Sequence, residues 1–299
     1  MNAGPAVSVV IPTYNRRALL VEAVGTVRSQ TQDDFELVIV DDGSTDGTAE
    51  ALQSLIAGDP RARVIRQSNH GTAMARNRGV AEARAPWVAF LDSDDLWESE
   101  YLASQLCALA DDPEADLVVG DVAYVNQGRK ADSLFADPDF RAPISLDAMC
   151  LGGWALPSAI VVRTEIARAI GFTNTYRIIE DTEFLLRCHV DGHRCILNPA
   201  RLVQWRRPEG EGAPAKTSEA FEIEVEMLEL MEAYRHLAPD PEAVARRLYA
   251  AHRSVAKSLS RSGQFREARP HLRACMRARP ARLGPRLLYL RGLFSIHRS

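Results

Sequence analysis

The sequence predicts an α/β protein with a mostly parallel sheet that carries helices on both faces. Two observations support this: short apolar, β-branched runs alternate with amphipathic stretches, and several strands are apolar throughout. Continuous apolar strands separated by helices are typical of a sheet buried on both faces. Strands are expected at 7–11, 35–40, 63–66 and 86–91, with helices at 16–30, 45–57 and 72–84.

The second half of the chain shows weaker periodicity. Residues 124–154 are rich in Asp, Pro and Gly, which favours long loops. A strand at 158–162, a helix at 180–191 and short strands at 196–197 and 202–206 are expected to follow. Residues 208–214 (PEGEGAP) have linker composition, and the rest looks helical. We therefore expect a domain boundary near residue 215, with an α/β domain at 1–215 and a helical region at 216–299.

Composition narrows the class of protein. The 299 residues are 46% hydrophobic and 25% charged, as in ordinary globular enzymes, and the net charge of −4 indicates no nucleic-acid partner. Five cysteines without C-x-x-C spacing argue against a disulfide framework and a zinc site. Neither a signal peptide nor an apolar run of about 18 residues is visible. The expected location is the cytoplasm.

Polar residues follow three of the expected strands: PTYN at 12–15, DDGSTDG at 41–47 and DSDD at 92–95. In parallel sheets, ligands bind beyond the carboxyl ends of the strands, so these carboxylates should converge. Their repulsion would be offset by a cation, and oxygen ligands suit Mg²⁺ or Mn²⁺. Taken alone, 41–47 fits a turn before a capped helix equally well. The order and spacing of the segments favour a metal and phosphate site.

These segments resemble family 2 glycosyltransferases of the GT-A fold. The resemblance covers about residues 7–207 and implies that 1–215 is a Rossmann-like catalytic domain. The matching segments are VSVVIPTYNR (7–16), SQT (29–31), FELVIVDDGSTDGT (35–48), the N-x-G-x-x-x-A-R-N-x-G segment (69–79), PWVAFLDSDDLW (86–97) and the Glu-Asp pair in IIEDTEFLLR.

The resemblance implies a nucleotide-sugar donor, expected to be UDP-linked. Pro12 and Tyr14 would line the nucleoside pocket, and Asp42 would accept a hydrogen bond from the base. Arg76 would lie near the donor and offset phosphate charge.

The same resemblance makes 92–94 a D-x-D segment. Asp94 would bind Mn²⁺ or Mg²⁺ between the two phosphates, and Asp92 would reach the ribose or the metal. Ser93, between them, is assigned to donor binding. The metal would stabilise the charge that grows on the leaving diphosphate.

The general base implied by the resemblance is Asp181. It would take the proton of a weakly nucleophilic acceptor hydroxyl during an inverting displacement. From the residues alone, Glu180-Asp181 also fits the capped first turn of a helix. Glu180 would orient the acceptor, and Trp154 either stacks on a sugar or belongs to the core.

The chain departs from the family pattern at two places. QWRR at 204–207 replaces the Q-x-x-R-W order of processive members, so a non-processive enzyme is expected, and 173–179 lacks a common acidic residue. The acceptor is left open as a glycan, a lipid-linked sugar or a protein. The alternatives are an inactive nucleotide-sugar-binding scaffold and a nucleotidyltransferase, for which PTYNRR is a poor phosphate loop.

The helical region has a strong charge asymmetry. An acidic helix is expected at 217–237, while from Arg253 onward twelve basic residues face one acid, Glu267. Residues 282–299 look like a basic amphipathic helix, which either lies on the inner face of a membrane or pairs with the acidic helix. Residues 251–280 resemble one tetratricopeptide repeat, with its turn, packing and stop positions at Gly263, Phe265, Ala268, Leu272 and Pro280.

Overall fold

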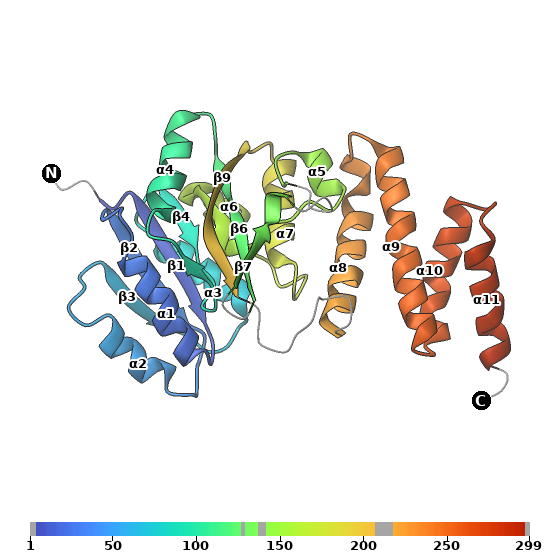
Figure 1. Ribbon diagram of the computed structural model, residues 1–299, viewed down its shortest axis with the longest axis horizontal. Coiled ribbons are helices and arrows are strands. Elements are labelled where there is room, and N and C mark those ends of the chain that lie inside the picture. Colours follow the sequence, from blue (N-terminus) through green and yellow to red (C-terminus); the bar gives the residue numbers. More distant parts are fainter. Residues whose placement is uncertain (1–3, 127–128, 137–141, 207–217, 297–299) are drawn as a thin grey trace. The chain divides into compact units, whose positions relative to one another are not determined.

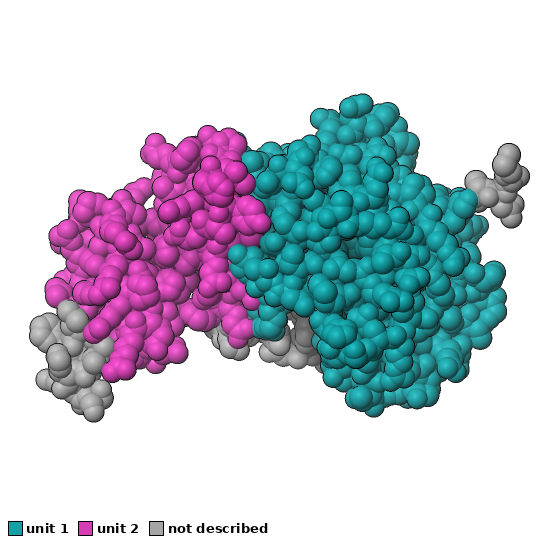
Figure 2. All heavy atoms as spheres, turned by 180° about the vertical axis from the view of Figure 1, so that it is seen from behind, with its two compact units in different colours: residues 1–149, 153–210 teal, residues 150–152, 211–299 magenta. Residues whose placement is uncertain are grey.

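The computed structural model describes residues 4–126, 129–136, 142–206 and 218–296 (Figure 1). The chain forms two compact units, residues 1–149 with 153–210 and residues 150–152 with 211–299 (Figure 2). The expected linker at 208–214 and the boundary expected near 215 lie outside the described residues.

The first unit is built on a mixed sheet with helices on both faces (Figure 1). Its strand order is β3-β2-β1-β4-β8-β6-β9-β5, with β7 paired to β6. The first four strands pair in parallel, as predicted, so the segments after β1, β2 and β4 leave the sheet at one edge. These strands are β1 (Val7–Thr13), β2 (Phe35–Asp41), β3 (Ala62–Arg66) and β4 (Trp87–Phe90).

The remaining strands of the described chain complete the sheet with pairings of both senses. β8 (Ile160–Arg163) is antiparallel to β4 and β6, while β9 (Cys195–Arg206) is parallel to β6 (Leu117–Asn126). The two-residue strand β5 (Leu96–Trp97) pairs antiparallel with β9 directly after the D-x-D segment. The loop at 92–95 is therefore held between two strands of the sheet.

Helix packing follows the alternation of side chains along the strands. α3 (Thr72–Glu82), α6 (Thr164–Ile170) and α7 (Glu180–Val190) cover the face to which Phe90 contributes, where its ring meets Phe172 and Phe184 edge-on. The other face carries α4 (Tyr101–Asp111), whose Gln105 lies over Gly120. The remaining helices of this part are α1 (Arg17–Arg28), α2 (Thr48–Leu55) and α5 (Leu146–Cys150), with 3₁₀ turns at Leu134–Ala136 and Pro157–Ala159.

The expectation of long loops at 124–154 is wrong in part. β6 continues to Asn126, β7 spans Arg129–Ser133, and α5 follows. β6 as a whole was not expected from the sequence; its Asp121 ties the strand to the segment that follows, because the buried carboxylate accepts a hydrogen bond from Ser133 Oγ at 2.5 Å and another from Phe135 N at 3.1 Å. A carboxylate inside a strand is stable only with such partners, which come from the neighbouring segment. The two short strands expected at 196–197 and 202–206 are likewise one strand, β9.

The second unit is helical throughout its described residues. Its helices are α8 (Ser218–Tyr234), α9 (Pro241–Arg261), α10 (Phe265–Ala278) and α11 (Leu283–Ile296), with a 3₁₀ turn at Arg235–Leu237. Gly263 takes φ +79° in the turn between α9 and α10, a conformation that L side chains rarely adopt. Ala268 and Leu272 are buried on α10, as the repeat-like pattern predicts. Among the described helices, none combines the length and apolarity needed to cross a bilayer.

Candidate active site

The ends of β1 and β2 are tied together by backbone and side-chain hydrogen bonds. Asn15 has φ +51°, which asparagine tolerates better than most residues. Its N–H donates to Ser44 Oγ at 3.0 Å, and its Oδ1 accepts from Thr45 N at 2.8 Å. Asp41 Oδ1 in turn accepts from Ser44 N at 2.9 Å. The two segments therefore form one rigid rim at the edge of the sheet.

Asp42 holds the next loop against this rim. Its carboxylate accepts hydrogen bonds from Gln67 Nε2 (2.8 Å), His70 N (3.0 Å) and Gly71 N (2.8 Å). Of the two residues expected to line the nucleoside pocket, Pro12 is buried in β1, while Tyr14 is 46% exposed on the rim.

Helix α3 explains why the segment at 69–79 needs its particular residues. Gly79 packs against β1 so closely that a Cβ would lie 2.3 Å from Val10 Cγ1. Asn77 donates from Nδ2 to Phe172 O at 2.8 Å and accepts from Phe172 N at 2.7 Å, which fixes the chain before α7. α3 therefore packs against the sheet and also fixes the segment that leads into α7.

Arg76 joins the D-x-D segment to the Glu-Asp pair. Its Nη2 donates to Asp92 Oδ1 at 2.7 Å and its Nη1 to Glu180 Oε1 at 2.7 Å, while the guanidinium lies 5.3 Å from the centre of the Phe172 ring. Burial alone would lower the pKa of Arg76, but the charges of Asp92 and Glu180 raise it above its ordinary value. This buried cation neutralises part of the acidic edge.

The carboxylates at 94 and 95 differ in their surroundings. Asp95 is buried and accepts from Ser158 Oγ at 2.6 Å, so it is a structural anchor of the loop. Asp94 is half-buried, and burial together with the nearby charge of Asp92 raises its pKa. Ser93, which lies between Asp92 and Asp94 in the sequence, is buried.

Arg206 clamps this loop from the end of β9. Its Nε donates to the carbonyl oxygen of Asp94, its backbone N to Asp95 Oδ1 at 3.2 Å and its Nη1 to Glu22 Oε2 at 2.5 Å. This role of Arg206 was not predicted from the sequence, where the residue stands only as part of the departure from the processive motif. The feature of the sequence that could have indicated this role is a basic residue at the end of an expected strand.

Asp181 stands in the first turn of α7. Its Oδ1 accepts from Thr182 N at 2.6 Å, and the N-cap position is occupied by Ile179, without a side-chain cap. Burial and the charge of Glu180 raise the pKa of Asp181 to about 8, although Arg76 opposes the shift. Such a carboxylate binds a proton unusually well, as a general base must.

The other acceptor candidates lie on two different elements. Glu180 is buried at the start of α7 and is bound by Arg76, with its Oε2 left without a hydrogen-bond partner. Trp154 is half-buried and meets Trp205 edge-on, with 6.3 Å between ring centres. The described residues hold no cluster of three or more His, Cys, Asp or Glu side chains of the kind that encloses a metal.

The chain is similar to known glycosyltransferases. The family model "Glycosyl transferase family 2" matches residues 8–148. The PGL/p-HBAD biosynthesis glycosyltransferase of Mycobacterium tuberculosis is 34% identical over 209 residues, which are 68% of this chain and 74% of that protein. The chain spans only 38% and 42% of the length of two Bacillus subtilis relatives, both named as putative glycosyltransferases.

Solved structures share the fold. Staphylococcus aureus TarS 1–349 in complex with UDP-GlcNAc has a TM-score of 0.68 at 19% identity, over 97% of this chain and 88% of that one. The mannosyltransferase PcManGT of Pyrobaculum calidifontis, in complex with GDP-Man and Mn²⁺, has a TM-score of 0.59 at 21% identity, over 99% and 86%. These likenesses confirm the predicted fold class. By its sequence relatives, the chain belongs to glycosyltransferase family 2.

Proposed function

We propose that this chain is an inverting, metal-assisted glycosyltransferase that moves a sugar from a UDP-linked donor to an acceptor hydroxyl. The observation that carries the proposal is the bridge made by Arg76. One guanidinium binds Asp92 of the D-x-D segment and Glu180, the neighbour of Asp181, each at 2.7 Å. The candidate donor carboxylates and the candidate base therefore belong to a single site.

The nucleotide is proposed to bind at the rim formed by the ends of β1 and β2. An ionised carboxylate has about four acceptor positions. Three acceptor positions of the Asp42 carboxylate are occupied by hydrogen bonds from the loop at 67–71. About one acceptor position therefore remains for an N–H of the base. Tyr14, which is half-exposed, offers its ring to the base. The UDP-GlcNAc bound to TarS and the GDP-Man bound to PcManGT support a nucleoside diphosphate sugar as the donor class.

The metal is proposed to bind at Asp94, with Asp92 as a second ligand or as a partner of the ribose. The raised pKa of Asp94 reflects burial and a like charge, which a divalent cation would compensate. Mg²⁺ is usually coordinated by one or two carboxylates of the protein and by phosphate oxygens of the substrate. Mn²⁺ binds the same kinds of oxygen ligand. The cation would stabilise the leaving diphosphate. Mn²⁺ in the PcManGT complex supports this choice.

The proposed base is Asp181. As the acceptor oxygen bonds to the anomeric carbon, the bond from that carbon to the diphosphate oxygen breaks, and the electron pair leaves with the nucleotide. The acceptor proton passes to the Asp181 carboxylate. A positioned base contributes about 10²–10⁴-fold to such a step. Glu180 and Trp154 are proposed to position the acceptor, which is a glycan, a lipid-linked sugar or a protein.

Two variants test the assignment. Asp94→Asn should abolish the Mn²⁺-dependent part of UDP affinity measured by calorimetry, whereas Asp181→Asn should leave UDP affinity nearly unchanged and lower donor turnover by about 10²-fold or more. Asp33→Asn is the charge control, because Asp33 is 95% exposed before β2. Hydrolysis of UDP-sugars without acceptor provides the turnover assay.

The same assays separate the alternatives. A binding scaffold would bind UDP-sugars and show no turnover with or without Mn²⁺, and a nucleotidyltransferase would release pyrophosphate from a nucleoside triphosphate. Unchanged Mn²⁺-dependent affinity in Asp94→Asn, or wild-type turnover in Asp181→Asn, would remove that residue from its proposed role.

A further inference from the structure

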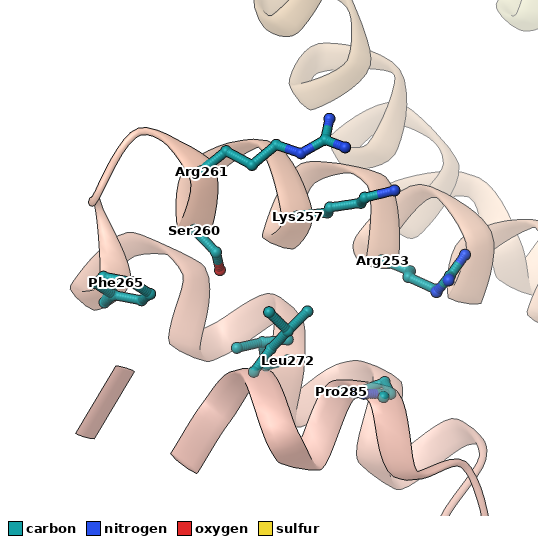
Figure 3. A pocket seen from close by; sticks show the side chains of 9 residues that line it. Arg253, Lys257, Ser260, Arg261, Phe265, Leu272 and Pro285 are labelled. Carbon is teal, nitrogen blue, oxygen red and sulfur yellow. The ribbon is translucent and has the colours of Figure 1, made fainter. Parts of the chain in front are cut away.

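A cavity of about 470 Å³ lies between α9, α10 and α11 in the helical unit, and Figure 3 shows it from close by. One side is basic and the other is apolar. Along α9 run Arg253, Lys257 and Arg261, and across from them lie Leu272 of α10 and Pro285 of α11 (Figure 3). The full lining is Arg253, Lys257, Ser260, Arg261, Phe265, Leu272, Gly284, Pro285 and Leu288.

The three cations form a row on one face of α9, because they are spaced four residues apart. Elsewhere on the same helix Arg246 pairs with Glu242 at 2.8 Å. Within the described part of the chain, no carboxylate forms an ion pair with any of the three cavity cations, and their side chains are exposed. Like charges at this spacing repel one another, so an external anion bound along the row would stabilise it.

The outer face of α11 is apolar and exposed. Leu283 is 67%, Leu287 64% and Leu290 49% exposed, and their spacing places them in one stripe. Pro285 and Leu288, on another face of the same helix, line the cavity. A helix with apolar residues on more than one face is normally covered on each of them, and a contiguous exposed stripe of this kind marks an interaction surface.

We propose that α9 and α11 dock on an anionic lipid bilayer, with lipid phosphates at the row Arg253, Lys257 and Arg261 and the leucine stripe Leu283, Leu287 and Leu290 in the acyl boundary. The combination decides the class of partner. The cationic row on α9 would bind anions, and the exposed apolar stripe on another face of α11 would bind a hydrocarbon surface. An anionic membrane provides both.

Internal pairing with the acidic helix α8 does not account for the basic residues. Among the described residues, Arg282 and Arg286 form no ion pair with α8, whose Glu232 instead binds Arg235 at 3.1 Å and His252 at 3.0 Å. Within the described chain, the exposed cations Arg253, Lys257, Arg261, Arg282 and Arg286 thus form no ion pair that would compete with an outside partner.

The experiment is co-sedimentation of the full chain with vesicles of phosphatidylcholine alone or mixed with phosphatidylglycerol, at low and high salt. The wild type should bind only the anionic vesicles, and less at high salt. Arg253→Gln/Lys257→Gln/Arg261→Gln should lower the partition coefficient about 100-fold, because each cation contributes about fivefold near an anionic surface. Leu283→Gln/Leu287→Gln should lower it about tenfold or more, since the apolar contact is lost.

The matched control is Arg78→Gln/Arg84→Gln/Arg194→Gln, which removes the same charge from exposed arginines of the other unit. It should bind anionic vesicles within about threefold of the wild type if the row is the site. Equal loss of binding in both triple variants would show a response to net charge only and would overturn the proposal. Circular dichroism of each variant establishes that the helices are intact.

Two further outcomes decide between occupants. If inorganic phosphate abolishes vesicle binding at an ionic strength where chloride does not, the row is a site for free phosphate and the lipid proposal fails. If both salts lower vesicle binding equally, the lipid proposal is supported. Should the leucine variant convert an oligomer to a monomer in light scattering while vesicle binding persists, the stripe serves a second copy and the proposal is wrong. These readouts need no enzyme activity, so they are independent of the proposed glycosyl transfer.

Discussion

Replacing Arg76 by methionine is the perturbation for which the structure predicts the largest effect. Methionine fills much of the same space, so the main loss is the cation between Asp92 and Glu180. Removing one partner of a buried ion pair costs about 3–5 kcal/mol, because the remaining charge is left uncompensated. The Glu180 side chain is 11% exposed and that of Asp92 is 24% exposed, so water can partly rehydrate Asp92. We therefore expect a loss of about 3–4 kcal/mol.

The assay is urea unfolding followed by tryptophan fluorescence. All four tryptophans, at 87, 97, 154 and 205, belong to the first unit, so the signal reports that unit alone. With a slope of about 3 kcal/mol per molar urea, the midpoint should fall by about 1 M. Adding Glu180→Gln to Arg76→Met should restore part of the loss, since the buried uncompensated carboxylate is then neutral.

Arg78→Met provides the matched control on the same helix. Arg78 makes an exposed pair with Glu82 at 2.9 Å, and exposed pairs of this kind contribute less than about 1 kcal/mol. The reasoning about Arg76 is refuted if Arg76→Met unfolds within about 1 kcal/mol of the wild type, or if Glu180→Gln destabilises the Arg76→Met protein further.

Three other predictions follow from single contacts. The raised pKa of Asp181 means that the transfer rate should fall with decreasing pH well above pH 4, and a kcat profile flat down to pH 5 would contradict the base assignment. Gly79→Ala should destabilise the first unit by about 1–2 kcal/mol, because overlap with Val10 outweighs the gain in helix propensity. In the same urea assay, the double variant Gly79→Ala/Val10→Ala should lose less free energy of unfolding than the sum of the two single variants. Burial and the charge of His252 lower the pKa of His271 below its ordinary 6.5, so the unfolded chain binds that proton more tightly. The stability of the helical unit should be full above about pH 6.5 and fall below it, and His271→Gln should flatten this dependence in thermal melts followed by circular dichroism.

Much of the first unit could be predicted from local patterns. The strands β1, β2 and β4 are mostly apolar and buried, and the polar turns after them are visible in the sequence, so the edge with 41–46 and 92–95 could be located. The strand β6 was not predicted at all; its Asp121 favours a loop in the sequence, and only the structure shows that Ser133 and Phe135 supply hydrogen bonds to it. Residues 173–179 were equally without a local signal.

The sequence alone determined the fold class, the family and the candidate carboxylates of the site, since apolar periodicity and short motifs are local properties of the chain. The tertiary structure decided which of these side chains meet. Arg76 reaches Glu180 across 104 positions, and Arg206 reaches the loop at 94–95 from more than 100 positions away. It also decided that, within the described residues, Arg253, Lys257 and Arg261 form no ion pair, and that one face of α11 is apolar and exposed. Contacts of this kind depend on helix packing and strand register, which no local pattern encodes.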